Sequence, residues 1–473
     1  MSKRSRLNRR ASPGALILLG LCLTRLPAAA SPQAVPSFQK YADIAERIRI
    51  SGLESETAFQ MLRELTTKAG PRLTGSAAAA RAVEMTRMMM MKDMGFETWL
   101  EPIMVQHWVR GVEEARLVDT DPPGTSALKI TALGWSVPTP GPGLTAPVIE
   151  VRSFEELPKL GLRVKDKIVF FNKRMNPAPM DTFSAYGEAA QFRSRGASEA
   201  ARAGAAAVLV RSATLRTDGL PHTGMVQYDP KIPKIPAAAV ATADADRLSD
   251  RLRNGAAVNV FLRLGCRELP PVPSANVVGQ IRGTERPEEI ILLGGHLDSW
   301  DLGTGAHDDG AGCVQAMEAV RLIKDLGLRP KRTIRIVLFM NEEFGSSGGR
   351  DYADAARRKT ERHLAAMESD RGGFLPLGFG IGGSRETFDK LKAWEPLLQP
   401  SGILWVRPGG GGGDIGPLAR TGTVLMGFVP DSQKYFDIHH SALDVLDSVH
   451  PRELELGAVI MAIMAYGLAQ EGI

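Results

Sequence analysis

Cysteine is scarce in this 473-residue chain, which contains only Cys22, Cys266 and Cys313. So few thiols exclude a fold that is held together by disulfide bonds. Cys313 lies among the apolar positions of a predicted helix, and this setting favours a buried packing residue over a reactive nucleophile.

Apolar runs of the length that matters for a membrane are also scarce. One follows the basic stretch KRSRLNRR near the N-terminus, where GALILLGLCL precedes the small residues PAAAS. This order is typical of a secretory signal, so we expect residues 1–31 to be a signal peptide that exports the protein to the periplasm or the medium. An uncleaved anchor is the alternative, but the apolar run is too short for a stable span. We expect no membrane partner after signal removal.

The chain beyond this leader has no excess of positive charge. The formal net charge is +5, but residues 1–31 contain one lysine, five arginines and no acid. Without these six charges, the rest of the chain carries a net charge of −1. A nucleic-acid partner is therefore not predicted.

The length of the chain predicts more than one domain. Residues 120–145 are rich in Pro, Gly and Thr, and a block with its own strand and helix patterns follows, up to the predicted linker CRELPPVPSA at 266–275. We interpret 125–270 as an α/β domain that is inserted into a larger one. The larger domain then consists of residues 32–124 and 271–473.

Strand and helix patterns alternate from residue 275 onward. EIILLGG and TIRIVLFMNEE are continuous apolar runs, typical of strands that are covered on both faces, and an amphipathic helical pattern lies between them. HLAAMESD and GTVLMGFVPD add two more strands, and ELELGAVIMAIMAYGLAQ a last helix. The pattern predicts an α/β fold with a mostly parallel, mixed central sheet flanked by helices.

Polar side chains follow three of these strands directly. His296 follows the first, Glu342 and Glu343 follow the second, and Asp370 follows the third. The functional crevice of such a sheet lies at the carboxyl ends of its strands. Carboxylates and imidazoles without thiolates suit zinc or a similar divalent ion, and a pair of ions needs a shared carboxylate.

The motifs GGHLDSW, GAHDDGAG, NEE, MESD and HHSALD, in this order between residues 294 and 444, resemble the zinc exopeptidase family of bimetallic aminopeptidases and glutamate carboxypeptidases. MLRELTTKAGPRLTGS and EPIMVQHWVRG extend the resemblance over nearly all of the exported chain. The resemblance implies the zinc exopeptidase fold, a protease-associated-like domain at 125–270, and a homodimer.

The same resemblance implies a site with two zinc ions. Asp308 would bridge both ions, His296 and Asp370 would complete the first, and Glu343 and His440 would complete the second. Ser441 and Asp444 occupy the family's positions after the last ligand, and they favour His440 over His439. Carboxylate-rich sites accept several divalent ions, so metals other than zinc stay open.

Further roles also follow from the resemblance. Asp298 would orient the imidazole of His296, and Glu342 would act as the general base. The peptide bond between Asp308 and Asp309 would be cis. His307 is expected to bind no metal, since the ligand set is complete without it.

The function predicted from these residues is that of a secreted dizinc exopeptidase for short peptides, with unblocked dipeptides as the expected substrates. An aminopeptidase that trims longer peptides is one alternative, and a non-catalytic binding protein on the same scaffold is another. Two features stay open. The run Gly409–Gly413 with Asp414 is either a flexible loop or a substrate-lining one, and Arg371 faces either a substrate carboxylate or solvent.

Overall fold

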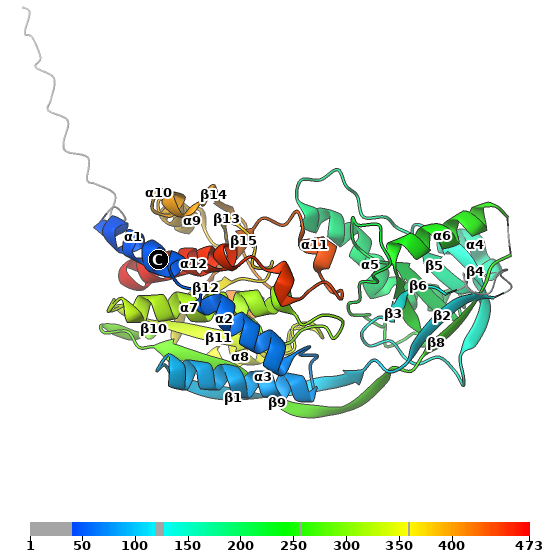
Figure 1. The fold of residues 1–473 in the computed structure, drawn as a ribbon, viewed down its shortest axis with the longest axis horizontal. Coiled ribbons are helices and arrows are strands. Elements are labelled where there is room, and N and C mark those ends of the chain that lie inside the picture. The colour runs from blue at the N-terminus through cyan, green and yellow to red at the C-terminus, as the bar shows by residue number, and fades with distance from the viewer. Residues whose placement is uncertain (1–39, 119–126, 256, 358–359) are drawn as a thin grey trace, which may run out of the picture. The chain divides into compact units, whose positions relative to one another are not determined.

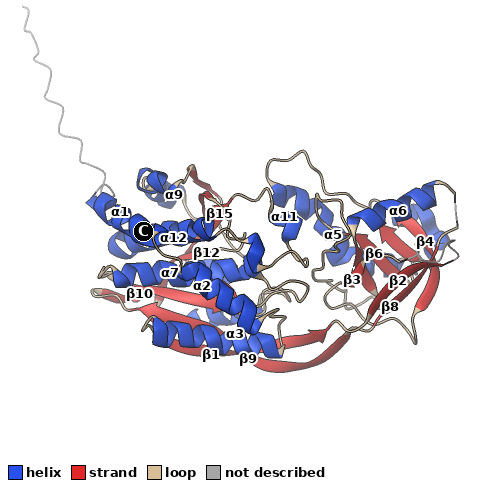
Figure 2. Ribbon diagram, in the orientation of Figure 1, coloured by secondary structure: helices blue, strands red, loops and turns tan. Residues whose placement is uncertain are grey.

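The computed structural model describes residues 40–118, 127–255, 257–357 and 360–473 of the chain. The predicted signal peptide, residues 1–31, lies outside the described residues. Among the described residues, the strands form two sheets, one of eight strands and one of seven. Figure 1 follows the elements in chain order, and Figure 2 separates helices from strands.

The eight-stranded sheet is mixed, with parallel pairing at its centre. β10 pairs in parallel with β11 and β12, and β12 pairs in parallel with β15. The predicted α/β fold with a mostly parallel, mixed sheet is confirmed. In order across the sheet, the strands are β1 (Glu97–Val109), β9 (Arg267–Ile281), β11 (Arg332–Phe339), β10 (Arg286–His296), β12 (Arg362–Glu368), β15 (Val424–Pro430), β13 (Pro376–Ile381) and β14 (Trp405–Pro408).

Both faces of this sheet are buried, which explains the continuous apolar runs of its central strands. Ile291 and Leu293 of β10 belong to one core, and Leu292 between them belongs to a second core with Tyr352. Tyr352 comes from α8 (Ser347–Arg357). The first core also contains residues of α1 (Ala42–Leu53), α2 (Thr57–Glu64), α3 (Ala77–Met88), α7 (Ala311–Asp325), α9 (Arg385–Lys392), α10 (Glu395–Leu398) and α12 (Pro451–Glu471).

The seven-stranded sheet is built from residues 113–264. Its first strand lies before residue 125, where we predicted the inserted domain to begin. Its helices are α4 (Glu156–Leu160), α5 (Thr182–Arg202) and α6 (Thr242–Arg253). In order across the sheet, the strands are β2 (Glu113–Val118), β8 (Asn259–Leu264), β4 (Leu144–Val151), β5 (Ile168–Phe171), β6 (Ala207–Arg211), β7 (Ala237–Val240) and β3 (Ile130–Ala132).

The stretch CRELPPVPSA, which we predicted to be a linker, is mostly strand. It forms the first part of β9, which pairs antiparallel with β1 along almost its whole length. β11 joins β9 only from Val277 onward, so Pro270, Pro271 and Pro273 lie where β9 has a single partner. Prolines are tolerated in a strand when the missing N–H faces away from a partner strand, and composition alone hides such a strand.

Helix α12 is long and apolar enough to cross a membrane, judged by length and composition alone. We had expected no membrane partner after signal removal. In the structure, 83% of the helix's most apolar window is buried inside the protein, where the helix contacts α1 and α7. Its composition is therefore that of a core helix.

One buried acid of α12 provides a test of the packing between α2, α7 and α12. Glu455 accepts a hydrogen bond from the backbone N–H of Ala58 at 2.9 Å, and its Oε2 accepts none among the described residues. Burial, helped by Glu318, raises the pKa of Glu455 to about 8. The folded state therefore holds this proton more tightly than the unfolded chain does. The resulting stabilisation is complete below about pH 4.5 and is lost as the pH rises through about 8.

We therefore predict that Glu455→Gln, which mimics the protonated acid, gains stability relative to wild type as the pH rises from 5 to 9. Urea unfolding at several pH values measures this difference. Glu453→Gln, on the same helix but not fully buried, is the matched control and should show no such trend. A difference for Glu455→Gln that stays constant with pH would contradict the prediction.

Candidate metal centre

The other four predicted metal ligands converge on the carboxylate of Asp308. Its Oδ1 lies 3.1 Å from His296 Nε2, and this nitrogen lies 3.4 Å from Asp370 Oδ1. Its Oδ2 lies 3.2 Å from His440 Nε2, and this nitrogen lies 3.2 Å from Glu343 Oε2. Each oxygen of Asp308 thus faces the imidazole of one predicted ligand, and each of these imidazoles also faces a further carboxylate. A carboxylate shared by two ions requires this arrangement.

The sheet brings these side chains together. His296 is the last residue of β10, Glu343 follows β11, and Asp370 follows β12. These strands are parallel neighbours, so their carboxyl ends meet at one edge of the sheet. Asp308 comes from the connection between β10 and α7, and His440 follows α11 (Tyr435–Ile438).

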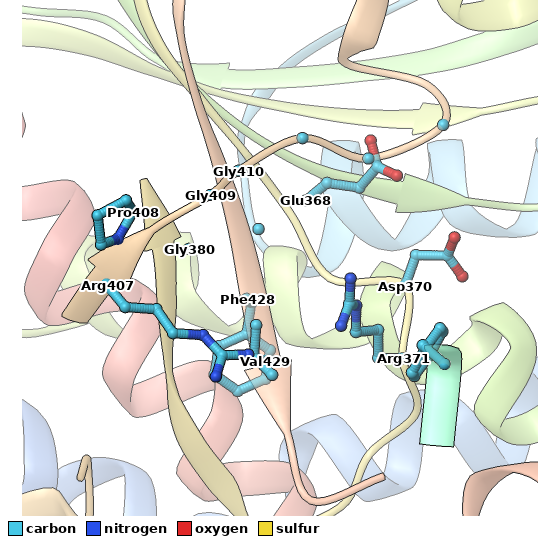
Figure 3. Close-up of a pocket in the computed structure, with 15 residues that line it drawn as sticks. Glu368, Asp370, Arg371, Gly380, Arg407, Pro408, Gly409, Gly410, Phe428 and Val429 are labelled. Atoms are coloured by element: carbon cyan, nitrogen blue, oxygen red, sulfur yellow. The ribbon is translucent and has the colours of Figure 1, made fainter. Parts of the chain in front are cut away.

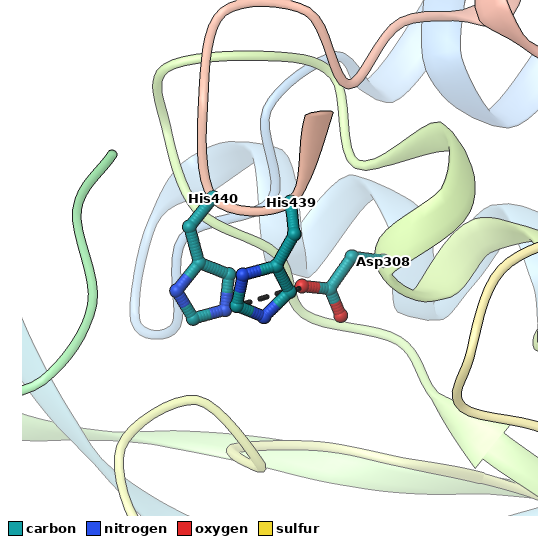
Figure 4. Close-up of side chains that lie close together, drawn as sticks. All are labelled: Asp308, His439 and His440. Atoms are coloured by element: carbon teal, nitrogen blue, oxygen red, sulfur yellow. Dashed lines mark ion pairs between the residues drawn. The ribbon is translucent and has the colours of Figure 1, made fainter. Parts of the chain in front are cut away.

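Two adjacent histidines reach Asp308, and their rings stack 3.5 Å apart (Figure 4). His439 Nε2 lies 3.6 Å from Asp308 Oδ2, farther than the 3.2 Å of His440. Unlike His439, His440 is also paired with Glu343. The Nδ1 of His440 lies 3.3 Å from the backbone carbonyl of Thr223, so an Nδ1–H there leaves Nε2 free to bind an ion. These contacts favour His440 as the ligand.

Asp309 lies beside Asp308 but serves the backbone. Its Oδ2 accepts the N–H of His296 at 2.9 Å, and its Oδ1 accepts the N–H of Gly312 at 3.0 Å. The peptide bond between Asp308 and Asp309 is cis, as the resemblance implied. Any Cβ at Gly312 would lie 1.9 Å from the carbonyl oxygen of Ser369, so only glycine fits there.

Asp298 makes contacts that differ from the predicted ones. The atom near His296 Nδ1 is the backbone oxygen of Asp298, at 3.0 Å, whereas its carboxylate Oδ1 is 3.9 Å away. The carboxylate instead accepts the backbone N–H groups of residues 341–343 and, at 2.6 Å, the hydroxyl of Thr74. The side chain of Asp298 therefore fixes the turn that carries both glutamates, and only its main chain orients the imidazole.

Glu342 lies on this turn and forms no ion pair with His296 or His440. It is half-buried and lines a cavity of about 350 Å³ together with His296, Asp308 and Glu343. Burial, helped by the charges of Asp370 and Glu343, raises the pKa of Glu342 well above its ordinary value. A carboxyl group of raised pKa beside the predicted ligands suits a group that takes up and releases a proton.

Residues far away in the sequence hold the loop that carries Asp308. Arg72, which has no exposed surface, donates hydrogen bonds to the carbonyls of Leu297, Thr304 and Gly305. The carboxylate of Asp444 accepts the backbone N–H groups of residues 307 and 308. Sequence reasoning did not assign a role to Arg72. Its only signal was the stretch TKAGPRLTGS, which carried part of the family resemblance.

The residues present fit a pair of divalent cations. Asp308 Oδ2 and Glu343 Oε1 are buried and accept no hydrogen bond from the described residues. Burial alone would lower the pKa of His296 and of His440, but the carboxylates around them raise both well above the ordinary value. The site thus favours positive charge at the positions between these groups. Imidazole and carboxylate donors without thiolates suit zinc.

The remaining predicted residues have distinct places. His307 uses both ring nitrogens away from the site, since Nδ1 accepts the N–H of Gly373 and Nε2 lies 3.1 Å from the carbonyl of Ser448. Asp414 is buried, with neither carboxylate oxygen hydrogen-bonded among the described residues. Arg371 and Gly409–Gly413 line a second cavity.

Comparisons with known proteins agree with this geometry. Residues 276–463 match Peptidase family M28. The chain is 37% identical to carboxypeptidase Q of Bos taurus over 91% of this chain and 89% of that protein. It is 36% identical to carboxypeptidase Q of Homo sapiens over 90% of this chain and 89% of that protein. The motifs MLRELTTKAGPRLTGS and EPIMVQHWVRG had indicated carboxypeptidase Q (plasma glutamate carboxypeptidase), and this likeness is confirmed.

Solved structures show the same relationship. A peptidase M28 precursor from Shewanella amazonensis superimposes with a TM-score of 0.88 at 32% identity, covering 92% of this chain and 98% of that chain. A zinc aminopeptidase from Bacillus subtilis shares the fold, with a TM-score of 0.65 at 17% identity, covering 88% of this chain and 96% of that chain. The chain therefore belongs to Peptidase family M28 and is a peptide hydrolase.

Proposed function

We propose that this protein is a dizinc exopeptidase that hydrolyses short peptides, with unblocked dipeptides as its preferred substrates. The observation that carries the proposal is the position of Asp308 between two imidazole–carboxylate pairs. The enzyme would act after export, as a secreted or periplasmic protein. Homodimerisation, which rests on the family resemblance, is part of the same proposal.

His296, Asp308 and Asp370 would hold one ion, and Asp308, Glu343 and His440 would hold the other. Bound zinc supplies a Lewis acid that polarises the substrate carbonyl and lowers the pKa of water. Other divalent ions can occupy such a ligand set.

Glu342 would carry out the proton transfers. Its carboxylate would accept a proton from the attacking water and then deliver it to the leaving amine. Asp298 supports this role because it fixes the backbone of residues 341–343, so that Glu343 turns to His440 while Glu342 does not pair with it. The cavity beside Glu342 has aromatic walls from Phe183, Tyr186 and Tyr435.

A serine nucleophile finds no support. Residues 345–349 match the pattern Gly-x-Ser-x-Gly, but the Oγ of Ser347 accepts a hydrogen bond from Asn341 Nδ2 and has no histidine partner among the described residues. A non-catalytic binding protein on this scaffold would need neither Glu342 nor the complete set of metal ligands. The presence of both favours an enzyme.

The first test is hydrolysis by the zinc-loaded protein of an unblocked dipeptide, of its N-acetylated form and of an unblocked hexapeptide. We expect rapid cleavage of the dipeptide and slow cleavage of the other two. Faster sequential trimming of the hexapeptide would favour the aminopeptidase alternative. No cleavage of any of them, despite bound zinc, would favour a binding protein and contradict the proposal.

We predict that Glu342→Gln lowers kcat by a factor of about 10²–10⁴, since the amide cannot accept a proton. Its zinc content should equal that of wild type, because Glu342 is not a proposed ligand. Glu386→Gln, whose side chain is 81% exposed on α9, serves as the matched control. Steady-state kinetics and metal analysis together check this prediction. A kcat above a tenth of the wild-type value would contradict the role of Glu342 as the general base.

Metal stoichiometry tests the sharing of Asp308. We expect two zinc ions per chain in wild type, one in His440→Ala, and close to none in Asp308→Asn, since both sites need its carboxylate. His450→Ala, an exposed histidine ahead of α12, should keep two. Elemental analysis after dialysis measures this. Retention of one full equivalent by Asp308→Asn would show that the carboxylate is not shared.

A further inference from the structure

Arg371 and Gly409–Gly413, which the proposed reaction leaves unused, line one and the same cavity of about 420 Å³ (Figure 3). Asp370 and Phe183 line this cavity and also the cavity of the metal centre. The two spaces are therefore neighbours, with a proposed metal ligand in the wall between them. A substrate held at the metal centre can extend one of its ends into this second cavity.

Arg371 is a cation without an anionic partner. The structure gives its guanidinium no hydrogen bond and no ion pair within the described ranges. Its guanidinium lies over the ring of Phe183, whose centroid is 4.3 Å from Cζ. That ring is itself held by stacking on Tyr435 at 5.4 Å. A guanidinium that makes a cation–π contact and no hydrogen bond among the described residues keeps its N–H groups available, and these groups match the two oxygens of a carboxylate.

Two glycines of the run lie too close to neighbouring atoms to carry a side chain. A Cβ on Gly410 would lie 2.4 Å from the backbone nitrogen of Gly382, and a Cβ on Gly412 would lie 2.1 Å from the carboxyl carbon of Glu368. Larger residues at these two positions would displace the loop. Glu368 is only 2% exposed and accepts the N–H of Ile415, so its carboxylate is tied to the loop.

The position of Arg371 sets which substrate residue it can read. Asp370 lines both cavities, so a substrate whose scissile bond lies at the metal centre would place a neighbouring residue beside Asp370, in the cavity that Arg371 lines. A cation in that cavity favours an anionic group, so we expect the residue on the carboxyl side of the scissile bond to lie there. That residue carries a carboxylate only when it is the last of the peptide.

We infer that Arg371 binds the α-carboxylate of the residue released from the C-terminal end of the substrate, whose side chain occupies the cavity between Phe183 and Gly409–Gly413. The inference rests on the proposed function and makes it more specific. Arg371 is then a specificity-determining residue, and the enzyme reads a free C-terminus. A longer peptide would place an uncharged amide against this guanidinium.

The test compares one N-terminally free dipeptide as the free acid and as the C-terminal amide, with wild type, Arg371→Gln and Arg371→Lys. We expect wild type to prefer the acid strongly. Arg371→Gln should lower kcat/KM for the acid roughly 10²-fold, mainly through KM, and change the amide less than threefold. Arg371→Lys, which keeps the charge but not the planar fork, should fall in between. The matched control is Arg385→Gln, whose side chain is 84% exposed on α9.

A second readout is the inhibition constant of the free amino acid product and of its amide, measured for wild type and for Arg371→Gln. This constant reports binding of the released residue and does not depend on how fast each enzyme turns over its substrate. Only the acid should lose inhibitory strength in Arg371→Gln. Equal losses for acid and amide would show that Arg371 only supports the site, and equal cleavage of both forms by wild type would also overturn the inference. In the first case the proposed function stands unchanged, and in the second the protein is still an exopeptidase but the proposed preference for a free C-terminus fails. If wild type with bound zinc cleaves neither form, the proposed function fails and the inference fails with it.

Discussion

The carboxylate of Asp308 is the group on which the rest of the site depends. Burial alone would raise its pKa, yet the imidazoles of His296 and His440 lower it well below the usual range. Further carboxylates, from Glu343 and Asp370, face the same imidazoles. A buried group of acids stays ionised only when positive charge faces it. The same requirement that keeps Asp308 ionised makes this position suitable for two divalent cations.

The fold meets this requirement through backbone contacts that leave the ligand atoms free. The carboxylate of Asp298 accepts hydrogen bonds from the backbone N–H groups of residues 341–343. The carboxylate of Asp444 accepts hydrogen bonds from the backbone N–H groups of residues 307 and 308. Arg72 ties down the carbonyls of the connection after β10. The carbonyl of Thr223, in the connection between β6 and β7, faces His440. These contacts fix each ligand's direction, and this lowers the reorganisation needed when an ion or a substrate binds.

The central strands and the residues at their ends could be predicted because local sequence determines both. An apolar run that is buried on both faces precedes His296, and another precedes the pair of glutamates at 342 and 343. The long strand β9 could not, because its prolines suggest a linker until β1 is known to be its single partner there. The contacts of Asp298 and Arg72 were also out of reach, since they depend on main-chain groups that only the folded chain brings near. Resemblance supplied the choice of His440 over its neighbour, and the distances to Asp308 and Glu343 support that choice.

The most direct test of the shared carboxylate is anomalous X-ray diffraction from crystals of the zinc-loaded protein, recorded on both sides of the zinc absorption edge. The account predicts two peaks about 3.5–4 Å apart, one at each oxygen of Asp308. One peak should lie near His296 and Asp370, and the other near Glu343 and His440. A single peak, or two peaks of which one does not touch Asp308, would contradict the central claim.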